Sequence, residues 1–187
     1  RMENMLATTE RTGGFTEYNS PTYTRVALEE SERALLLIRD EATRRAADRL
    51  RYHAWRMLAE RFHPATGQMA GPQARAYSDW IPPSLARYLS RQTGAEIRPH
   101  ATPRGQLDLG VDHDMVAPLP CPEDIRPRFH RLAQDPLEVV TRFALHPGGD
   151  IIGTTWLSGG ACLGSVNRGV GWIQQRVLLG YWNTPQD

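Results

Sequence analysis

The sequence contains no lysine, so all 22 of its basic residues are arginines. These arginines are spread along the chain, and 21 acidic residues leave a formal net charge of only +1. Proteins that bind nucleic acids concentrate positive charge on one stretch or one face. The charge pattern therefore does not indicate binding to a nucleic acid, and we expect no nucleic-acid partner.

Cysteine and long apolar runs are also scarce. Cys121 and Cys162 are the only two cysteines, too few for a disulfide framework or a closed zinc site. No run of about 18 apolar residues occurs, so the sequence predicts no membrane span. With 40% hydrophobic residues, the chain has the composition of a globular protein that can bury a core. It opens on Arg1 and ends just after a strand pattern, from which we expect a fragment of a larger protein.

Two long helices are predicted near the start, over residues 21–38 and 41–62. Ser20 followed by proline is a typical helix start, and Asp40 can cap the second helix. One or two residues join the helices, so they must form an antiparallel hairpin. The loop before the first helix and the loop after the second then lie at the same end. The apolar run 35–38 indicates a helix end buried among other helices.

The rest of the sequence, after residue 77, predicts one more helix and then a sheet. A third helix is expected over 82–92, ending at Gly94. Prolines recur through 99–136, which is typical of an extended crossing segment. Alternating apolar residues then predict antiparallel strands, which we place at 137–145, 151–157, 161–166 and 172–182. The predicted organisation is α+β, with a helical part (1–98), the crossing segment (99–136) and a β part (137–187).

The two loops that the hairpin brings together are rich in polar side chains. Glu17, Tyr18 and Asn19 lie in the first loop, and Tyr23 lies in the first turn of the helix that follows. The second loop, 63–77, is long, and long ordered loops on a rigid scaffold are usually functional. It carries His63, Gln68, Arg75 and Tyr77.

These residue types suit β-elimination on a uronic-acid polysaccharide. The reaction needs a group that neutralises the sugar carboxylate, for which Asn19 and Arg75 are candidates. It needs a base for the C5 proton, either His63 or Tyr77, and an acid at the leaving oxygen, either Tyr23 or Tyr77. We assign Glu17, Tyr18 and Gln68 to substrate binding. Each of these side chains also has an ordinary structural role open to it, as a cap, a core residue or an ion-pair partner.

The residues carry a resemblance to a known family. Gly-Phe-Thr-Glu-Tyr-Asn-Ser-Pro-Thr-Tyr (14–23) precedes the helix pair, and His-Pro-Ala-Thr-Gly-Gln-Met-Ala-Gly-Pro-Gln-Ala-Arg-Ala-Tyr (63–77) follows it. Leu-Gly-Ser-Val-Asn-Arg (163–168) and Trp-Ile-Gln-Gln-Arg-Val-Leu-Leu-Gly-Tyr-Trp (172–182) come later. This pattern resembles heparinase II/III-like polysaccharide lyases.

The resemblance implies an (α/α) toroid portion followed by the first strands of a β-sandwich. It also implies an acidic polysaccharide or oligosaccharide as partner and a periplasmic or secreted location. Related lyases use Asn, His, Tyr and Arg in a groove at the end of the toroid, for which the matching positions are Asn19, His63, Arg75 and Tyr77.

Three alternatives stay open. A non-catalytic carbohydrate-binding or scaffold protein needs no catalytic groove, and Trp156, Trp172 and Trp182 could stack on sugar rings. A glycoside hydrolase needs two carboxylates, and Glu17 and Asp79 are the acids of the facing loops. A metal could bind Asp112-His113-Asp114 with His100 or His130, but this spacing matches no closed zinc pattern. We predict neither a cofactor nor a metal site.

Overall fold

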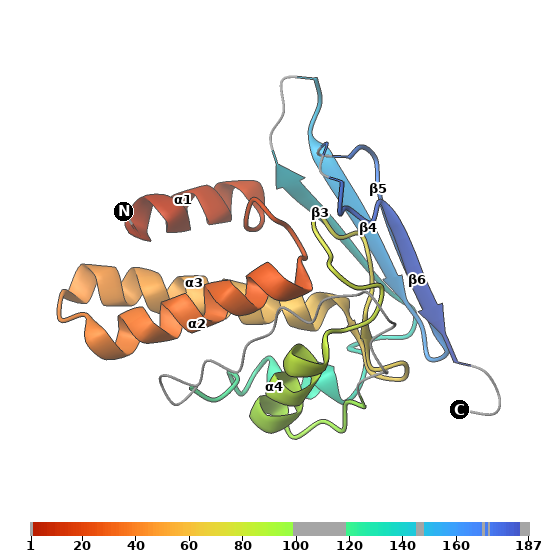
Figure 1. Cartoon of the computed structure of the whole chain (residues 1–187), viewed down its shortest axis with the longest axis horizontal. Coiled ribbons are helices and arrows are strands. Elements are labelled where there is room, and N and C mark those ends of the chain that lie inside the picture. Colours follow the sequence, from red (N-terminus) through yellow and green to blue (C-terminus); the bar gives the residue numbers. More distant parts are fainter. Residues whose placement is uncertain (1, 99–118, 145–147, 170, 172, 184–187) are drawn as a thin grey trace.

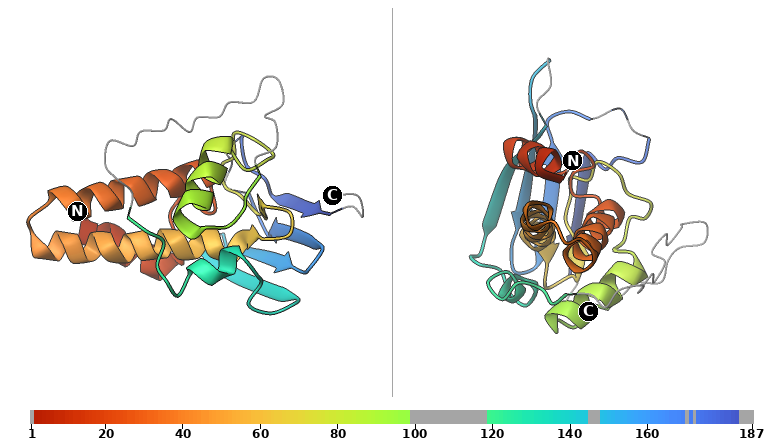
Figure 2. Two further views of the ribbon diagram at one scale, coloured as in Figure 1. Left: turned by 90° about the horizontal axis from the view of Figure 1, so that it is seen from below. Right: turned by 90° about the vertical axis from the view of Figure 1, so that its left-hand side faces the viewer.

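The computed structural model of the protein describes residues 2–98, 119–144, 148–169, 171 and 173–183. Helices lie on one side and a four-stranded antiparallel sheet on the other (Figure 1). Seen along the helices, α1, α2 and α3 lie on the same face of the sheet (Figure 2, right). The α+β class predicted from the sequence is confirmed.

The predicted helical hairpin is confirmed. Helix α2 (Pro21–Leu37) and helix α3 (Glu41–Arg61) run side by side (Figure 2, left). The Ser20 hydroxyl accepts from the Tyr23 backbone N–H at 3.3 Å, and the Asp40 carboxylate accepts from the Thr43 backbone N–H at 2.8 Å. Both caps satisfy N–H groups that have no partner within the helix.

The tip of the hairpin differs from the prediction. Leu36, Leu37 and Ile38 are 48%, 71% and 40% exposed, so this apolar helix end is not buried among other helices in the described chain. Helix α1 (Met2–Thr12) was not predicted and packs on α3 through Leu6. Its only buried residues are Leu6 and Thr9, and this leaves little apolar periodicity to detect.

Between α3 and α4 the chain is irregular but buried. Strand β1 (Phe62–His63) pairs with β2 (Gln68–Met69) in a short hairpin, where the sequence predicted only a loop. Helix α4 (Pro83–Thr93) follows and ends at Gly94, whose φ of 75° gives the predicted left-handed C-cap. Part of the predicted crossing segment lies outside the described residues, but 119–136 contains a short 3₁₀ helix, η1 (Arg126–Phe129), that packs on the helical core.

The sheet is formed by β3 (Leu137–Ala144), β4 (Ile151–Leu157), β5 (Ala161–Val166) and β6 (Leu178–Trp182), in that order. Three strands begin as predicted, but β6 begins at Leu178 rather than near 172. The preceding residues instead pair with the irregular segment, where Gln73 and Arg176 form an antiparallel bridge. The inner face of the sheet contacts the helical part, and the Phe143 ring stacks on Tyr18.

The outer face of the sheet carries large apolar side chains that no part of the described chain covers. The exposed large side chains of its strands are Val140, Ile152, Trp156, Leu163, Leu178 and Trp182. The described residues contain this sheet and the two-stranded hairpin only, so a second sandwich layer is not present among them. No helix in the described part of the chain is both long and apolar enough to cross a membrane.

Candidate functional site

Asn19 joins the two loops that the sequence predicted to meet. Its side-chain amide donates to the Ala70 carbonyl at 2.9 Å and to the Pro72 carbonyl at 2.7 Å, and the residue is only 1% exposed. Its backbone has a φ of 49°, a left-handed conformation that asparagine adopts more readily than most residues. The Ala74 N–H donates to the Tyr18 carbonyl at 3.0 Å. Asn19 therefore holds one loop against the other and does not face solvent.

Tyr18 is a core residue. It is 1% exposed, and its ring stacks on Phe143 with centroids 4.1 Å apart. Burial raises the pKa of Tyr18 to about 12. The side chain that we expected in substrate binding instead ties the first loop to the sheet.

His63 and Gln68 are also fully buried. The His63 Nδ1 lies 2.8 Å from the Thr66 hydroxyl, and its Nε2 contacts the Ser158 carbonyl. A neutral ring satisfies both partners if Nε2 donates and Nδ1 accepts. Burial lowers the pKa of His63, which favours this neutral form. The Gln68 Oε1 accepts from the Ile81 N–H at 2.8 Å. His63 thus links the β1–β2 hairpin to the sheet.

Four of the predicted side chains do meet at the surface, and we call them the Arg75 cluster: Glu17, Tyr23, Arg75 and Tyr77. The Arg75 guanidinium lies over both tyrosine rings, 5.2 Å from the centroid of Tyr23 and 5.3 Å from that of Tyr77. The two tyrosine hydroxyls are 3.0 Å apart, and Arg75 Nη1 lies 3.0 Å from the Glu17 carboxylate. All four side chains are partly exposed.

Backbone pairing holds the Arg75 cluster together. Tyr23 lies in the first turn of α2, directly after the Ser20 cap. The segment carrying Arg75 and Tyr77 is fixed to the sheet side because the Ala76 N–H donates to the Gln174 carbonyl at 2.8 Å. The Gln174 side chain also accepts from Arg75 Nε at 2.9 Å.

Charge and burial both act on the titratable groups of the cluster. Partial burial and the hydrogen bond with Tyr23 raise the pKa of Tyr77, so its hydroxyl keeps its proton. The hydrogen bond to Glu17 raises the pKa of Arg75. The cluster therefore combines a permanent positive charge with a phenol that is a proton donor at neutral pH.

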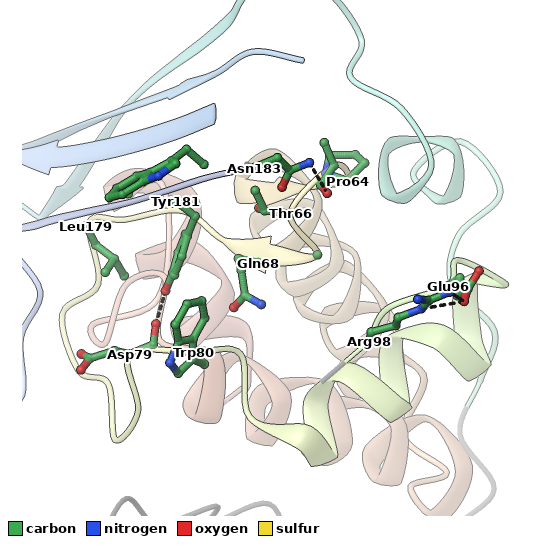
Figure 3. Close-up of a pocket in the computed structure, with 14 residues that line it drawn as sticks. Pro64, Thr66, Gln68, Asp79, Trp80, Glu96, Arg98, Leu179, Tyr181 and Asn183 are labelled. Carbon is green, nitrogen blue, oxygen red and sulfur yellow. Dashed lines mark hydrogen bonds and ion pairs between the residues drawn. The ribbon is translucent and has the colours of Figure 1, made fainter. Parts of the chain in front are cut away.

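A separate cleft of about 970 Å³ lies beside the β1–β2 hairpin (Figure 3). We call it the Trp80 cleft. Its walls come from the hairpin, the loop after Tyr77, the segment after α4 and the end of β6. Its lining includes Gln68, Asp79, Trp80, Glu96, Arg98 and Tyr181. We did not predict this cleft, although Trp80 next to an acidic residue in a proline-flanked loop is a signal for it.

The remaining candidates lie apart from the Arg75 cluster or outside the described residues. Asp79 pairs with Arg176 at 2.6 Å, so the two carboxylates considered for hydrolysis each have an arginine partner. His100, the run 112–114 and Trp172 lie outside the described residues. His130 Nε2 lies 3.0 Å from the Thr93 carbonyl. Among the described residues, no three His, Cys, Asp or Glu side chains gather where they could hold a metal ion.

Part of the chain matches a known family. Residues 3–90 match a family described as Domain of unknown function (DUF8769). This range runs from α1 into α4 and contains the whole Arg75 cluster. Neither the curated proteins nor the solved structures gave a match to this chain.

Proposed function

We propose that the protein acts on an acidic polysaccharide by β-elimination at the Arg75 cluster. One observation carries the proposal. A single guanidinium lies over two tyrosine rings, and the hydroxyls of these tyrosines are 3.0 Å apart. This arrangement supplies a cation for the sugar carboxylate and two oxygen atoms that can exchange protons.

Arg75 is the group that would bind the uronate carboxylate. An arginine beside this carboxylate makes the neighbouring C5–H bond easier to break, because it stabilises the charge that develops as the proton leaves. In the free protein Arg75 already holds a carboxylate, that of Glu17 at 3.0 Å. A substrate carboxylate would therefore meet a guanidinium whose orientation is set by Glu17 and by the Gln174 side chain.

The tyrosine pair would move the protons. The Tyr23 oxygen would take the C5 proton while its own hydroxyl proton passes to Tyr77 along the hydrogen bond between them. The C4–O4 bond would break as the C4=C5 double bond forms, and Tyr77 would give its original proton to O4. Both tyrosines would then again carry a proton, as they did before the reaction. Since both groups lie together, they would act on the same side of the sugar ring.

Asn19 and His63 take positioning roles in this proposal. Asn19 lies in the loop just before α2, which carries Tyr23. Its hydrogen bonds to the Ala70 and Pro72 carbonyls hold that loop against the segment that leads to Arg75. His63 is buried and holds the hairpin to the sheet at Ser158. Tyr23 therefore replaces His63 as the proposed base.

We further propose that the helices belong to an (α/α) toroid and the sheet to a β-sandwich. Two exposed apolar surfaces support this. The hairpin tip at 36–38 is the kind of surface that neighbouring toroid helices cover, and the outer sheet face is the kind that a second sheet covers. Non-catalytic carbohydrate binding is the second candidate function. The Trp80 cleft favours it, because a ligand could bind there without any proton transfer.

The test is an elimination assay on the full chain. A panel of uronate polysaccharides is incubated with the protein, and the unsaturated product is followed by its ultraviolet absorbance. We expect activity on at least one substrate, and a loss of 100-fold or more in both Tyr77→Phe and Arg75→Ala, since general acid–base groups contribute about 10²–10⁴-fold.

Matched controls are available on the helices. Tyr52 is exposed on α3, where its hydroxyl donates to Asp124, and Arg45 is exposed on the same helix. Tyr52→Phe and Arg45→Ala should leave the rate unchanged. If folded protein gives no unsaturated product on any uronate, or if Tyr77→Phe is as active as Tyr52→Phe, elimination at this cluster is rejected. New reducing ends without unsaturation would point to hydrolysis instead.

A further inference from the structure

We propose that the Trp80 cleft binds a neutral pyranose unit of an oligosaccharide. This site is distinct from the Arg75 cluster and does not depend on elimination. It is formed where the β1–β2 hairpin, the Asp79–Trp80 loop and β6 meet (Figure 3). Its volume of about 970 Å³ falls within the range of small-molecule sites.

A buried amide at the base of the cleft is the first observation. Gln68 is fully buried, and its Oε1 accepts from the Ile81 N–H at 2.8 Å. That bond fixes the orientation of the amide, because the NH₂ group cannot accept from a backbone N–H. The Gln68 Nε2 is then left without a hydrogen-bond partner among the described residues. Buried donors normally have one, and a ligand oxygen in the cleft would supply it.

The aromatic wall is the second observation. The Trp80 ring packs on Tyr181 with centroids 5.6 Å apart and remains partly exposed. The Tyr181 hydroxyl donates to the Asp79 backbone carbonyl, which holds the loop in place (Figure 3). A partly exposed indole offers a flat apolar surface, on which the C–H face of a sugar can lie. The Asp79 carboxylate at the same wall can accept from sugar hydroxyls.

The charge of the cleft favours a neutral ligand. Its charged lining residues are Asp79, Glu96 and Arg98, which are two carboxylates and one guanidinium. Glu96 and Arg98 pair with each other at 2.7 Å on the exposed rim. A uronate would meet no excess of positive charge here, in contrast to the Arg75 cluster.

The sheet edge argues against an extended peptide as the ligand. A peptide that adds to a sheet uses the backbone groups of its edge strand. Next to this cleft part of that edge is already used, because Gly71 N–H donates to the Leu179 carbonyl and Gln73 exchanges two backbone bonds with Arg176. This shortens the edge on which a peptide could pair.

The experiment is calorimetric titration of the full chain with neutral β-1,4-linked hexasaccharides of glucose, mannose and xylose. We expect at least one to bind. Trp80→Phe and Gln68→Glu should each weaken that binding tenfold or more. Gln68→Glu retains an oxygen for Ile81 and removes the amide donor. Asp79→Asn, at an exposed side chain, is a third variant that does not disturb the core.

Two controls separate this site from others. Trp156→Phe changes an exposed tryptophan on the outer sheet face, and Arg75→Ala removes the charge of the other cluster. Both should bind the hexasaccharide as the parent does. The proposal is overturned if no neutral hexasaccharide binds to folded protein, or if the cleft variants bind normally while Arg75→Ala does not. Because neutral sugars have no carboxylate, these results do not depend on the elimination assay.

Discussion

Replacing Asn19 by alanine should destabilise the protein by several kcal/mol. The side chain is 1% exposed and donates to the Ala70 and Pro72 carbonyls at 2.9 and 2.7 Å. Each buried polar group left without a partner costs about 1–3 kcal/mol, so the two carbonyls together cost about 2–6 kcal/mol. Alanine at a φ of 49° adds about 1 kcal/mol relative to glycine. The expected loss is about 3–7 kcal/mol, a large part of the roughly 5–15 kcal/mol that stabilises a typical domain.

Urea unfolding followed by circular dichroism measures this loss, and a second variant separates its two parts. Asn19→Gly removes the same hydrogen bonds but relieves the left-handed backbone, so it should be about 1 kcal/mol more stable than Asn19→Ala. Asn183→Ala is the control, since that amide donates to the Ala65 carbonyl at 2.9 Å in an exposed position. It should lie within about 0.5 kcal/mol of the parent. An Asn19→Ala variant as stable as Asn183→Ala would refute the reasoning.

Two further predictions concern the contact between the irregular segment and the sheet. Gly164→Ala should cost several kcal/mol in thermal unfolding, because its new Cβ would lie 1.7 Å from the Gly71 carbonyl oxygen. Gly160→Ala, which has nothing within 4 Å, should change little, and equal melting temperatures would contradict the contact. Burial lowers the pKa of His63, so the unfolded state binds more protons, and stability should fall as pH drops below about 6.5. His63→Gln should reduce this pH dependence, and an unchanged slope would show that His63 does not titrate as argued.

Much of the helical architecture could be predicted because it rests on local signals. The Ser20 and Asp40 caps and the Gly94 stop are each readable from one residue and its neighbours. Strand β3 was readable because its burial alternates. Helix α1 was missed because only Leu6 and Thr9 are buried along it. The start of β6 was misplaced because apolar residues before it, such as the 45% exposed Val177, continue the pattern without forming a strand.

The location of the candidate site could be predicted from the sequence, but which of its side chains are exposed could not. Antiparallel pairing of α2 and α3 brings the two polar loops together, and this follows from the short connection alone. Which of their side chains face solvent depends on contacts with the sheet side. Tyr18 is buried where its ring stacks on Phe143, and His63 is buried where its ring contacts the Ser158 carbonyl. Both partners lie more than 90 residues along the chain from His63 or Tyr18, beyond any local pattern.

The buried polar residues share one physical cause. The chain between α3 and α4 lies in the interior with little regular secondary structure, so its backbone groups lack ladder partners and need side chains to satisfy them. The Asn19 amide donates to the Ala70 and Pro72 carbonyls, and the Gln68 Oε1 accepts from the Ile81 N–H. Asparagine and glutamine are thus residue types that the folding of this segment requires, and their presence alone is weak evidence for catalysis. The Arg75 cluster differs, because its side chains bond mainly to one another at the surface. That difference is why the proposed chemistry rests on the arginine and the two tyrosines.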